Sequence, residues 1–294
     1  MDYPIEVVLD AKMELGEGPC WDWRNNMLYC VDIEGKKIHM YNPSLNKQKV
    51  IKLDRQISAI VPSAKQDTKF VITLENGFHI IDIEKNELEY IADPEKEIVD
   101  NRFNDGKCDA YGRFWGGTMS VNNKPQHAAL YCLDVNGEIT KKVNDLTISN
   151  GIAWSGDNEF LYLIDTPAEK VIRFEYDLKT AQLGNAKDII DFSEEPGFPD
   201  GMTIDREGML WIAHFGGGRV SRWNPDNGEK IDEILIPAPN VTSCTFGGRY
   251  LDELYITTAR SGLDVEQLEQ YPLSGGLFKV KLNIKGLKAN LCNK

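Results

Sequence analysis

The sequence predicts an all-β protein, a six-bladed β-propeller made of four-stranded antiparallel blades. The first observation is a β-hairpin pattern, clearest at Pro199–Phe215, in which two short apolar segments flank a polar turn. The second is that this pattern occurs six times, with its paired apolar residues 42 to 49 positions apart. A β-rich repeat of roughly 40–50 residues is typical of a propeller blade. The repeated pairs are Leu28-Tyr29, Phe70-Val71, Phe114-Trp115, Leu161-Tyr162, Leu210-Trp211 and Leu254-Tyr255.

A third observation concerns the start of the first strand in each repeat. The equivalent position always carries a side-chain oxygen, although its neighbours are strongly apolar. The innermost strands of a propeller start at the same end of the central channel, so these positions should form a ring at its mouth. Buried polar groups need water, a ligand or an ion as a partner, and we interpret the ring as a metal-ion site. Its members are Glu17, Ser58, Asn104, Asn150, Asp200 and Ser243.

The repeat is unbroken, so we expect residues 1–294 to form one propeller domain. A strand-like run at residues 3–10 precedes the first complete repeat, and another, Gly276–Leu282, follows the last hairpin. Propellers commonly close by letting strands from both termini share one blade, because this removes the open edge of the sheet. We expect that closure here.

The blades are expected in chain order. Blade three opens with the densest polar cluster, Asn101–Lys107, which should lie on the channel face. The polar insertion at 120–128 is either a surface loop or a lid over the channel. Residues 261–274 should form a short helix or a long loop. Blade one spans Gly16–Asn42 and blade two, expected to be purely structural, spans Ile57–Ile83; blades four, five and six begin at Asn150, Asp200 and Thr242.

Composition and charge narrow the possible partners. The net charge of −13 argues against nucleic acid and anionic membranes, since both require a basic face. No apolar stretch approaches the roughly 20 residues that span a bilayer, and the N-terminus does not resemble a secretory signal. We therefore expect a cytoplasmic protein that acts on a small molecule, either as a monomer or as a weak homo-oligomer. Its six scattered cysteines have no CxxC spacing and should be buried thiols.

Several standard catalytic motifs are missing from the sequence. It has no GxSxG nucleophile elbow, no Walker loop and no HExxH motif, and its four histidines share no ligand-like spacing. The glycines of FGGGR at 215–219 follow a strand pattern but do not open a helix, so a dinucleotide site is disfavoured.

Three members of the polar ring form a plausible ligand set. Glu17, Asn150 and Asp200 provide two carboxylates and a carboxamide oxygen at equivalent blade positions. Hard oxygen ligands suit Ca²⁺, Mg²⁺ or Mn²⁺ better than they select Zn²⁺. The alternative interpretation is that each side chain only caps its own strand by bonding backbone groups.

The motifs as a group resemble the SMP-30/gluconolactonase/regucalcin family, in every blade except the second. The resemblance implies a six-bladed propeller with one divalent metal ion in its channel, and that family includes sugar lactonases. The matching motifs are Glu17-Gly18-Pro19 with Trp21-Asp22, NRFNDGKCD at 101–109, GGTM at 116–119, SNG at 149–151, PDGM at 199–202, LWIAHFGGGRV at 210–220, TSCTFGG at 242–248 and GGLFKV at 275–280.

The resemblance also assigns roles to residues. It implies that Glu17, Asn150 and Asp200 bind the metal and that Arg102 and Asn104 contact the substrate. We expect Asp200 to be the general base as well. In animal members an acidic residue that helps to hold the sugar follows the GTM motif, whereas Val121 stands there in this sequence.

The resulting prediction is a divalent-metal-dependent hydrolase that opens aldonolactones such as glucono-1,5-lactone. Ca²⁺ is favoured as the cofactor over Mg²⁺, Mn²⁺ and Zn²⁺. Two alternatives stay open: a hydrolase of non-sugar lactones or esters on the same fold, and a calcium-binding propeller without turnover.

Overall fold

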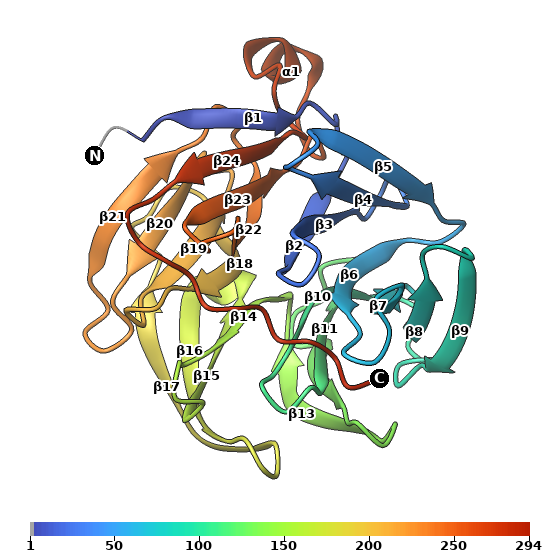
Figure 1. Ribbon diagram of the computed structural model, residues 1–294. Helices are drawn as coiled ribbons and strands as arrows, with labels where there is room; N and C mark the ends of the chain where they lie inside the picture. Colours follow the sequence, from blue (N-terminus) through green and yellow to red (C-terminus); the bar gives the residue numbers. More distant parts are fainter. Residues whose placement is uncertain (1–2) are drawn as a thin grey trace.

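Six four-stranded antiparallel sheets surround a central channel, which confirms the predicted six-bladed propeller (Figure 1). The computed structural model describes residues 3–294. Every apolar pair that marked a repeat lies in the second strand of its blade, and the residue that opens each repeat lies in the first strand. The repeat therefore located the two inner strands of every blade correctly.

The blades follow the order of the chain. Blade one contains β2 (Gly16–Asp22), β3 (Met27–Asp32), β4 (Lys37–Asn42) and β5 (Lys47–Lys52). Blade two contains β6 (Ile57–Pro62), β7 (Lys69–Leu74), β8 (Gly77–Asp82) and β9 (Glu87–Ala92). Blade three contains β10 (Asn101–Cys108), β11 (Phe114–Ser120), β12 (Ala128–Leu133) and β13 (Ile139–Leu146). Blade four contains β14 (Ser149–Trp154), β15 (Phe160–Asp165), β16 (Lys170–Asp177) and β17 (Gln182–Asp191), with the 3₁₀ turn η1 (Thr166–Ala168). Blade five contains β18 (Phe198–Ile204), β19 (Leu210–Phe215), β20 (Arg219–Trp223) and β21 (Lys230–Leu235).

Blade six is shared between the two ends of the chain, as predicted. It contains β22 (Val241–Gly247), β23 (Glu253–Thr258) and β24 (Leu277–Lys281), and β1 (Ile5–Leu9) is its outermost strand. β1 pairs antiparallel with β24, with Ile5 opposite Val280. Between β23 and β24 the chain forms the short helix α1 (Val265–Gln270), which starts at a capping box made by Asp264 and Gln267 and buries none of its residues.

Apolar packing joins each blade to the next. The described residues contain six clusters of buried apolar side chains, and each cluster draws on two neighbouring blades. Aromatic pairs cross these junctions: the rings of Trp115 and Trp154 are 5.9 Å apart, and those of Trp21 and Tyr255 are 5.6 Å apart. The ring of blades is thus continuous, with the junction between blades six and one packed like the others.

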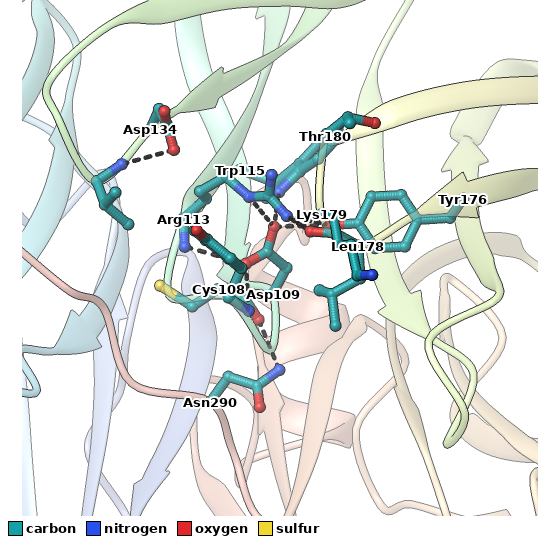
Figure 2. A network of polar contacts seen from close by, with 12 residues as sticks. Cys108, Asp109, Arg113, Trp115, Asp134, Tyr176, Leu178, Lys179, Thr180 and Asn290 are labelled. Atoms are coloured by element: carbon teal, nitrogen blue, oxygen red, sulfur yellow. Dashed lines mark hydrogen bonds and ion pairs between the residues drawn. The ribbon is translucent and has the colours of Figure 1, made fainter.

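Buried aspartates organise the turns after the first strands of blades one, three and five; they are Asp22, Asp109 and Asp205. Asp109 accepts hydrogen bonds from the backbone N–H groups of Tyr111 and Arg113 with one oxygen. With the other it accepts from the Arg113 guanidinium at 2.7 Å, the Trp115 indole at 2.9 Å and the Tyr176 hydroxyl at 2.7 Å (Figure 2). Tyr176 belongs to blade four, so the same carboxylate links two blades. In blade five, Asp205 bonds the backbone of its turn and the Trp211 indole in the same way.

A segment at 285–293, which we call the crossing segment, runs over the end of the channel where the inner strands finish (Figure 1). Its hydrogen bonds to blades five, six, one, three and two are Arg206 N–H to Lys285 O, Gly286 N–H to Leu251 O, the Trp23 indole to Ala289 O, Asn290 Nδ2 to Cys108 O, and Cys292 N–H to Pro62 O. The sequence did not indicate this segment.

Three further expectations can be compared with the structure. The insertion after β11 is an exposed loop at 121–127, held to the start of β10 by the Lys124–Asp100 ion pair. All six cysteines are free thiols; five are buried and Cys20 is partly exposed. In the described range, no helix has the length and apolar character needed to cross a bilayer.

Candidate metal and substrate site

The six positions of the predicted ring all lie in inner strands, and all six side chains are buried. In each blade the pairing register between the first and second strands shifts at or beside this position. Such a bulge locally releases the strand from its ladder and can redirect a side chain. A shared backbone irregularity, which the sequence did not reveal, therefore accompanies the polar ring.

A chain of hydrogen bonds connects blades three, four and five at this end of the channel. Arg102 Nη1 donates to Asn104 Oδ1 at 2.9 Å, and Asn104 Nδ2 donates to Asn150 Oδ1 at 3.0 Å. Asn150 Nδ2 donates in turn to Thr166 Oγ1 at 2.8 Å, and that hydroxyl donates to Pro199 O at 2.9 Å. The two amide groups are therefore oriented, and Asn150 Oδ1 is held as an acceptor beside Asn104.

Glu17 and Asp200 belong to the same electrostatic cluster. Burial, followed by the negative charge of Asp105, raises the pKa of Glu17 to about 8. Burial and the charges of Glu17 and Asp105 raise the pKa of Asp200 well above its ordinary value. Arg102 opposes both effects, while its own pKa is lowered by burial. The structure thus brings together all five residues that the sequence singled out.

Asp105 is a member of this cluster that the sequence analysis missed. It is buried; its Oδ1 accepts the Gly106 N–H at 2.7 Å, whereas its Oδ2 has no hydrogen-bond partner among the described residues. Lys107 donates to Met202 O across the channel and partly offsets the negative charge. The signal was present in the polar cluster of blade three, but Asp105 is one residue away from the repeated position.

The residues fit a divalent metal ion. Glu17 and Asp200 are buried carboxylates with raised pKa values; the charge of Asp105 contributes to both and that of Glu17 to Asp200, and a cation between them would relieve this repulsion. Over residues 3–294, no three His, Cys, Asp or Glu side chains gather as a ligand group, so an ion would also need the carboxamide oxygen of Asn150. This all-oxygen set suits a hard cation.

The capping alternative accounts for only part of the site. Glu17 Oε2 accepts the N–H of Gly18 at 2.9 Å, and Asp200 also bonds the N–H of the residue that follows it. Each carboxylate therefore caps its own strand. Capping does not explain why two carboxylates with raised pKa values are buried beside Asp105, because an uncharged side chain could cap the strand without that repulsion.

The channel continues beyond the site toward the crossing segment. A cavity of about 290 Å³ lies there, lined by inner-strand residues such as Lys107 and Trp154 and by residues 287–290 of the crossing segment. Glu17, Asn150 and Asp200 do not line it. Asp105 and Ser243 do line it, so the cavity reaches the inner side of the candidate site, whose proposed metal ligands lie where the inner strands begin.

Comparison with known proteins gives an independent view of the whole chain. The family model described as the SMP-30/Gluconolactonase/LRE-like region matches residues 15–260. YvrE of Bacillus subtilis, provisionally named a sugar lactone lactonase, is 38% identical over 286 residues, which is 97% of each chain. Regucalcin of Danio rerio is 39% identical over 287 residues, which is 96% of each chain. The solved structure of a calcium-binding protein, regucalcin from Agrobacterium tumefaciens, is 28% identical with a TM-score of 0.94, covering 99% of this chain and 98% of that one.

Proposed function

The chain belongs to the SMP-30/gluconolactonase/LRE-like family, and from this premise we propose that it is a divalent-metal-dependent lactonase acting on aldonolactones. The observation that carries the proposal is the cluster of Glu17, Asn150 and Asp200 beside the hydrogen-bonded pair Arg102 and Asn104. Ligands for a hard cation and donors for a polyhydroxylated molecule meet at one end of the channel.

Glu17, Asp200 and Asn150 Oδ1 would hold the ion. When bound there, a divalent ion polarises the ester carbonyl and stabilises the negative charge that develops on its oxygen. The name of the Agrobacterium relative makes Ca²⁺ the first ion to test. Mg²⁺, Mn²⁺ and Zn²⁺ are the alternatives.

Asp200 is the proposed general base. In the metal-free protein, burial and the charges of Glu17 and Asp105 raise the pKa of Asp200, and a cation bound beside it would return the carboxylate to its deprotonated, proton-accepting form. It would take a proton from the water that attacks the lactone carbonyl and return it to the ring oxygen that leaves. Arg102 would hold substrate hydroxyl oxygens with the N–H groups not used for Asn104 and Phe103 O, and Asn104 would assist it.

The test begins with metal-stripped protein resupplied with Ca²⁺, Mg²⁺, Mn²⁺ or Zn²⁺, with hydrolysis of glucono-1,5-lactone followed by pH-stat. We expect activity to disappear and to return with at least one ion. Asp200→Asn should lower kcat by about 10²–10⁴-fold, the usual contribution of a general base, while the thermal unfolding temperature shows that the protein is folded. Near-normal kcat for this variant would refute the role of Asp200.

A panel of substrates separates the alternatives. A hydrolase of non-sugar esters should prefer δ-valerolactone or aryl esters to aldonolactones. A calcium-binding propeller without turnover should bind Ca²⁺ in calorimetry and hydrolyse none of them. Either result would replace the aldonolactonase proposal.

A further inference from the structure

An exposed carboxylate, Glu34, lies at the mouth of the channel, and the proposed mechanism does not use it. It belongs to the loop between β3 and β4. Because β2 and β3 are antiparallel, β3 ends where β2 begins, and β2 begins with Gly16 and Glu17. The N–H of Ile33 donates to Leu15 O, two residues before Glu17. Glu34 is therefore on the same end of the channel as the proposed metal ligands.

The loop that carries Glu34 has a defined position. Buried Asp32 accepts the N–H of Gly35 at 2.9 Å and the N–H of Leu15 at 3.0 Å, so the loop is joined to the start of the inner strand. Ser261, from the loop after β23 in blade six, donates its hydroxyl to Glu34 Oε1 at 3.1 Å. The other oxygen, Oε2, has no hydrogen-bond partner among residues 3–294. Glu34 thus offers a positioned acceptor on an exposed side chain.

The charge of Glu34 reaches Arg102, although the two residues belong to blades one and three. Burial lowers the pKa of Arg102, and the carboxylates of Glu17, Glu34 and Asp200 oppose this, in that order of strength. Glu34 therefore acts on the guanidinium more strongly than Asp200, which is part of the candidate site.

Arg102 keeps donors for a ligand. Within the described chain it donates from Nη1 alone, to Phe103 O at 2.8 Å and to Asn104 Oδ1 at 2.9 Å, and it forms no direct ion pair with Glu34. The N–H groups of Nε and Nη2 are left over. A carboxylate and a guanidinium thus attract each other across the channel mouth without contact, and each has hydrogen-bonding capacity to spare.

A hydroxyl group has the chemistry to join this pair. Its oxygen accepts a hydrogen bond from the guanidinium, and its hydrogen is donated to the carboxylate. Each bond has one charged partner, which makes it stronger than a bond between neutral groups. An anionic substituent also accepts from Arg102, but it has no hydrogen to give to Glu34 and is repelled by its charge. The pair therefore favours a neutral hydroxyl group.

We propose that Glu34 is a substrate-binding residue that holds one hydroxyl group of the lactone together with Arg102 and selects neutral polyhydroxylated lactones over carboxylated ones. This inference rests on the lactonase proposal for the nature of the ligand. It adds blade one to the part of the site that recognises hydroxyl groups. The loop after β11, which carries Val121, is then not required for this contact.

The first test compares Glu34→Ala with Glu14→Ala. Glu14 is an exposed acid beside the same loop, and its charge is not among those that act on Arg102. In Glu34→Ala the KM for glucono-1,5-lactone should rise about tenfold, as for one lost hydrogen bond, with little change in kcat. Hydrolysis of δ-valerolactone, which carries no hydroxyl groups, should be unaffected, and Glu14→Ala should alter neither substrate. An unchanged KM for gluconolactone in Glu34→Ala would overturn the proposal.

Monodeoxy analogues of gluconolactone identify the hydroxyl group concerned. One analogue should have a KM about tenfold above that of gluconolactone in the unmodified protein and should be insensitive to Glu34→Ala, because the bond is already missing. If the variant weakened every analogue by the same factor, Glu34 would act only through the field at the channel mouth and would not be a binding residue.

Glu34→Gln tests the charge. Glutamine keeps an oxygen that can accept the Ser261 hydroxyl, but it is neutral. The inhibition constant of glucaro-1,4-lactone, which carries a carboxylate, should fall about threefold or more relative to that of glucono-1,4-lactone. Glu14→Gln should leave this ratio unchanged. The same ratio in Glu34→Gln as in the unmodified protein would refute the discrimination against carboxylates.

Calorimetric binding of gluconolactam, which is not readily hydrolysed, separates this proposal from the lactonase proposal. If no lactone is hydrolysed but Glu34→Ala weakens lactam binding about tenfold, the role of Glu34 is supported and the hydrolase is refuted. If lactones are hydrolysed and Glu34→Ala changes neither lactam binding nor KM, the hydrolase stands and Glu34 is not part of its site. A lactam that does not bind the unmodified protein would count against the role of Glu34 as well.

Discussion

Glu17 combines deep burial with two neighbouring carboxylates, and this has a measurable effect on the metal-free protein. Its pKa in the fold is about 8, compared with an ordinary 4.5, chiefly because of burial and then because of Asp105. The native state therefore holds this proton more tightly than the unfolded state. The contribution of Glu17 to stability is accordingly greatest below about pH 4.5 and is lost as the pH rises toward 8.

Glu17→Gln should remove this dependence. In the presence of EDTA, its free energy of unfolding should exceed that of the unmodified protein by more than about 1 kcal/mol at pH 8 and should be similar near pH 5. Urea denaturation between pH 5 and pH 9 measures both. Parallel profiles would contradict the assignment, and the exposed Glu89→Gln on β9 controls for the loss of a negative charge.

The individual residues of the site also show how much of it could be predicted from the sequence. Glu17, Asn104, Asn150 and Asp200 were found because residues at the same position of each blade repeat lie at the same depth around the central channel. Asp105 and Thr166 were missed because they lie outside that position, and their importance depends on which segments meet between blades. Distances of that kind are not encoded in the period of the repeat.

At the scale of strands and turns, the buried aspartates after the inner strands are charged groups that depend on several hydrogen-bond partners at once. Asp109 is fully buried and serves Arg113, Trp115 and Tyr176 at once. Removing one partner of a buried ion pair leaves the other charge without compensation, which typically costs about 3–5 kcal/mol.

Asp109→Ala should therefore lower the free energy of unfolding by about 3–5 kcal/mol in chemical denaturation. Asp157, in the corresponding turn of blade four, is the matched comparison because its bonds to Ser155 and Glu159 are exposed to solvent. Asp157→Ala should cost less than about 1 kcal/mol. Equal losses at the two positions would show that burial of the network is unimportant.

Strands differed in how clearly the sequence marked them. The inner strands have apolar cores and were predicted from the repeat, whereas the outermost strands β5 and β9 are largely exposed. Little hydrophobic pattern distinguishes such a strand from a loop. The fourth strand of blades one to five was thus expected from the fold class and could not be located in the chain, whereas that of blade six, β1, was located from the run at residues 3–10.

At the scale of the whole molecule, closure depends on β1. Deleting residues 3–9 would leave β24 as an unpaired edge, which is open to pairing with another chain. We expect a lower thermal unfolding temperature and concentration-dependent association in size-exclusion chromatography. Replacing α1 with a short flexible loop is the control and should change neither property, because the helix buries no residues. Equal behaviour of the two variants would argue against closure by β1.

The shared blade also determines the order in which the protein can be completed during synthesis. β1 is synthesised before the three other strands of blade six. Its pairing partner, β24, is synthesised last, after β22 and β23. Blades one to five can form and pack in sequence as they emerge, but blade six cannot. The crossing segment, which holds five blades together at one end of the channel, emerges later still. A nascent chain that stalls before residue 277 therefore displays an open ring with two unsealed faces, and such intermediates are the form in which this fold is most exposed to aggregation and proteolysis.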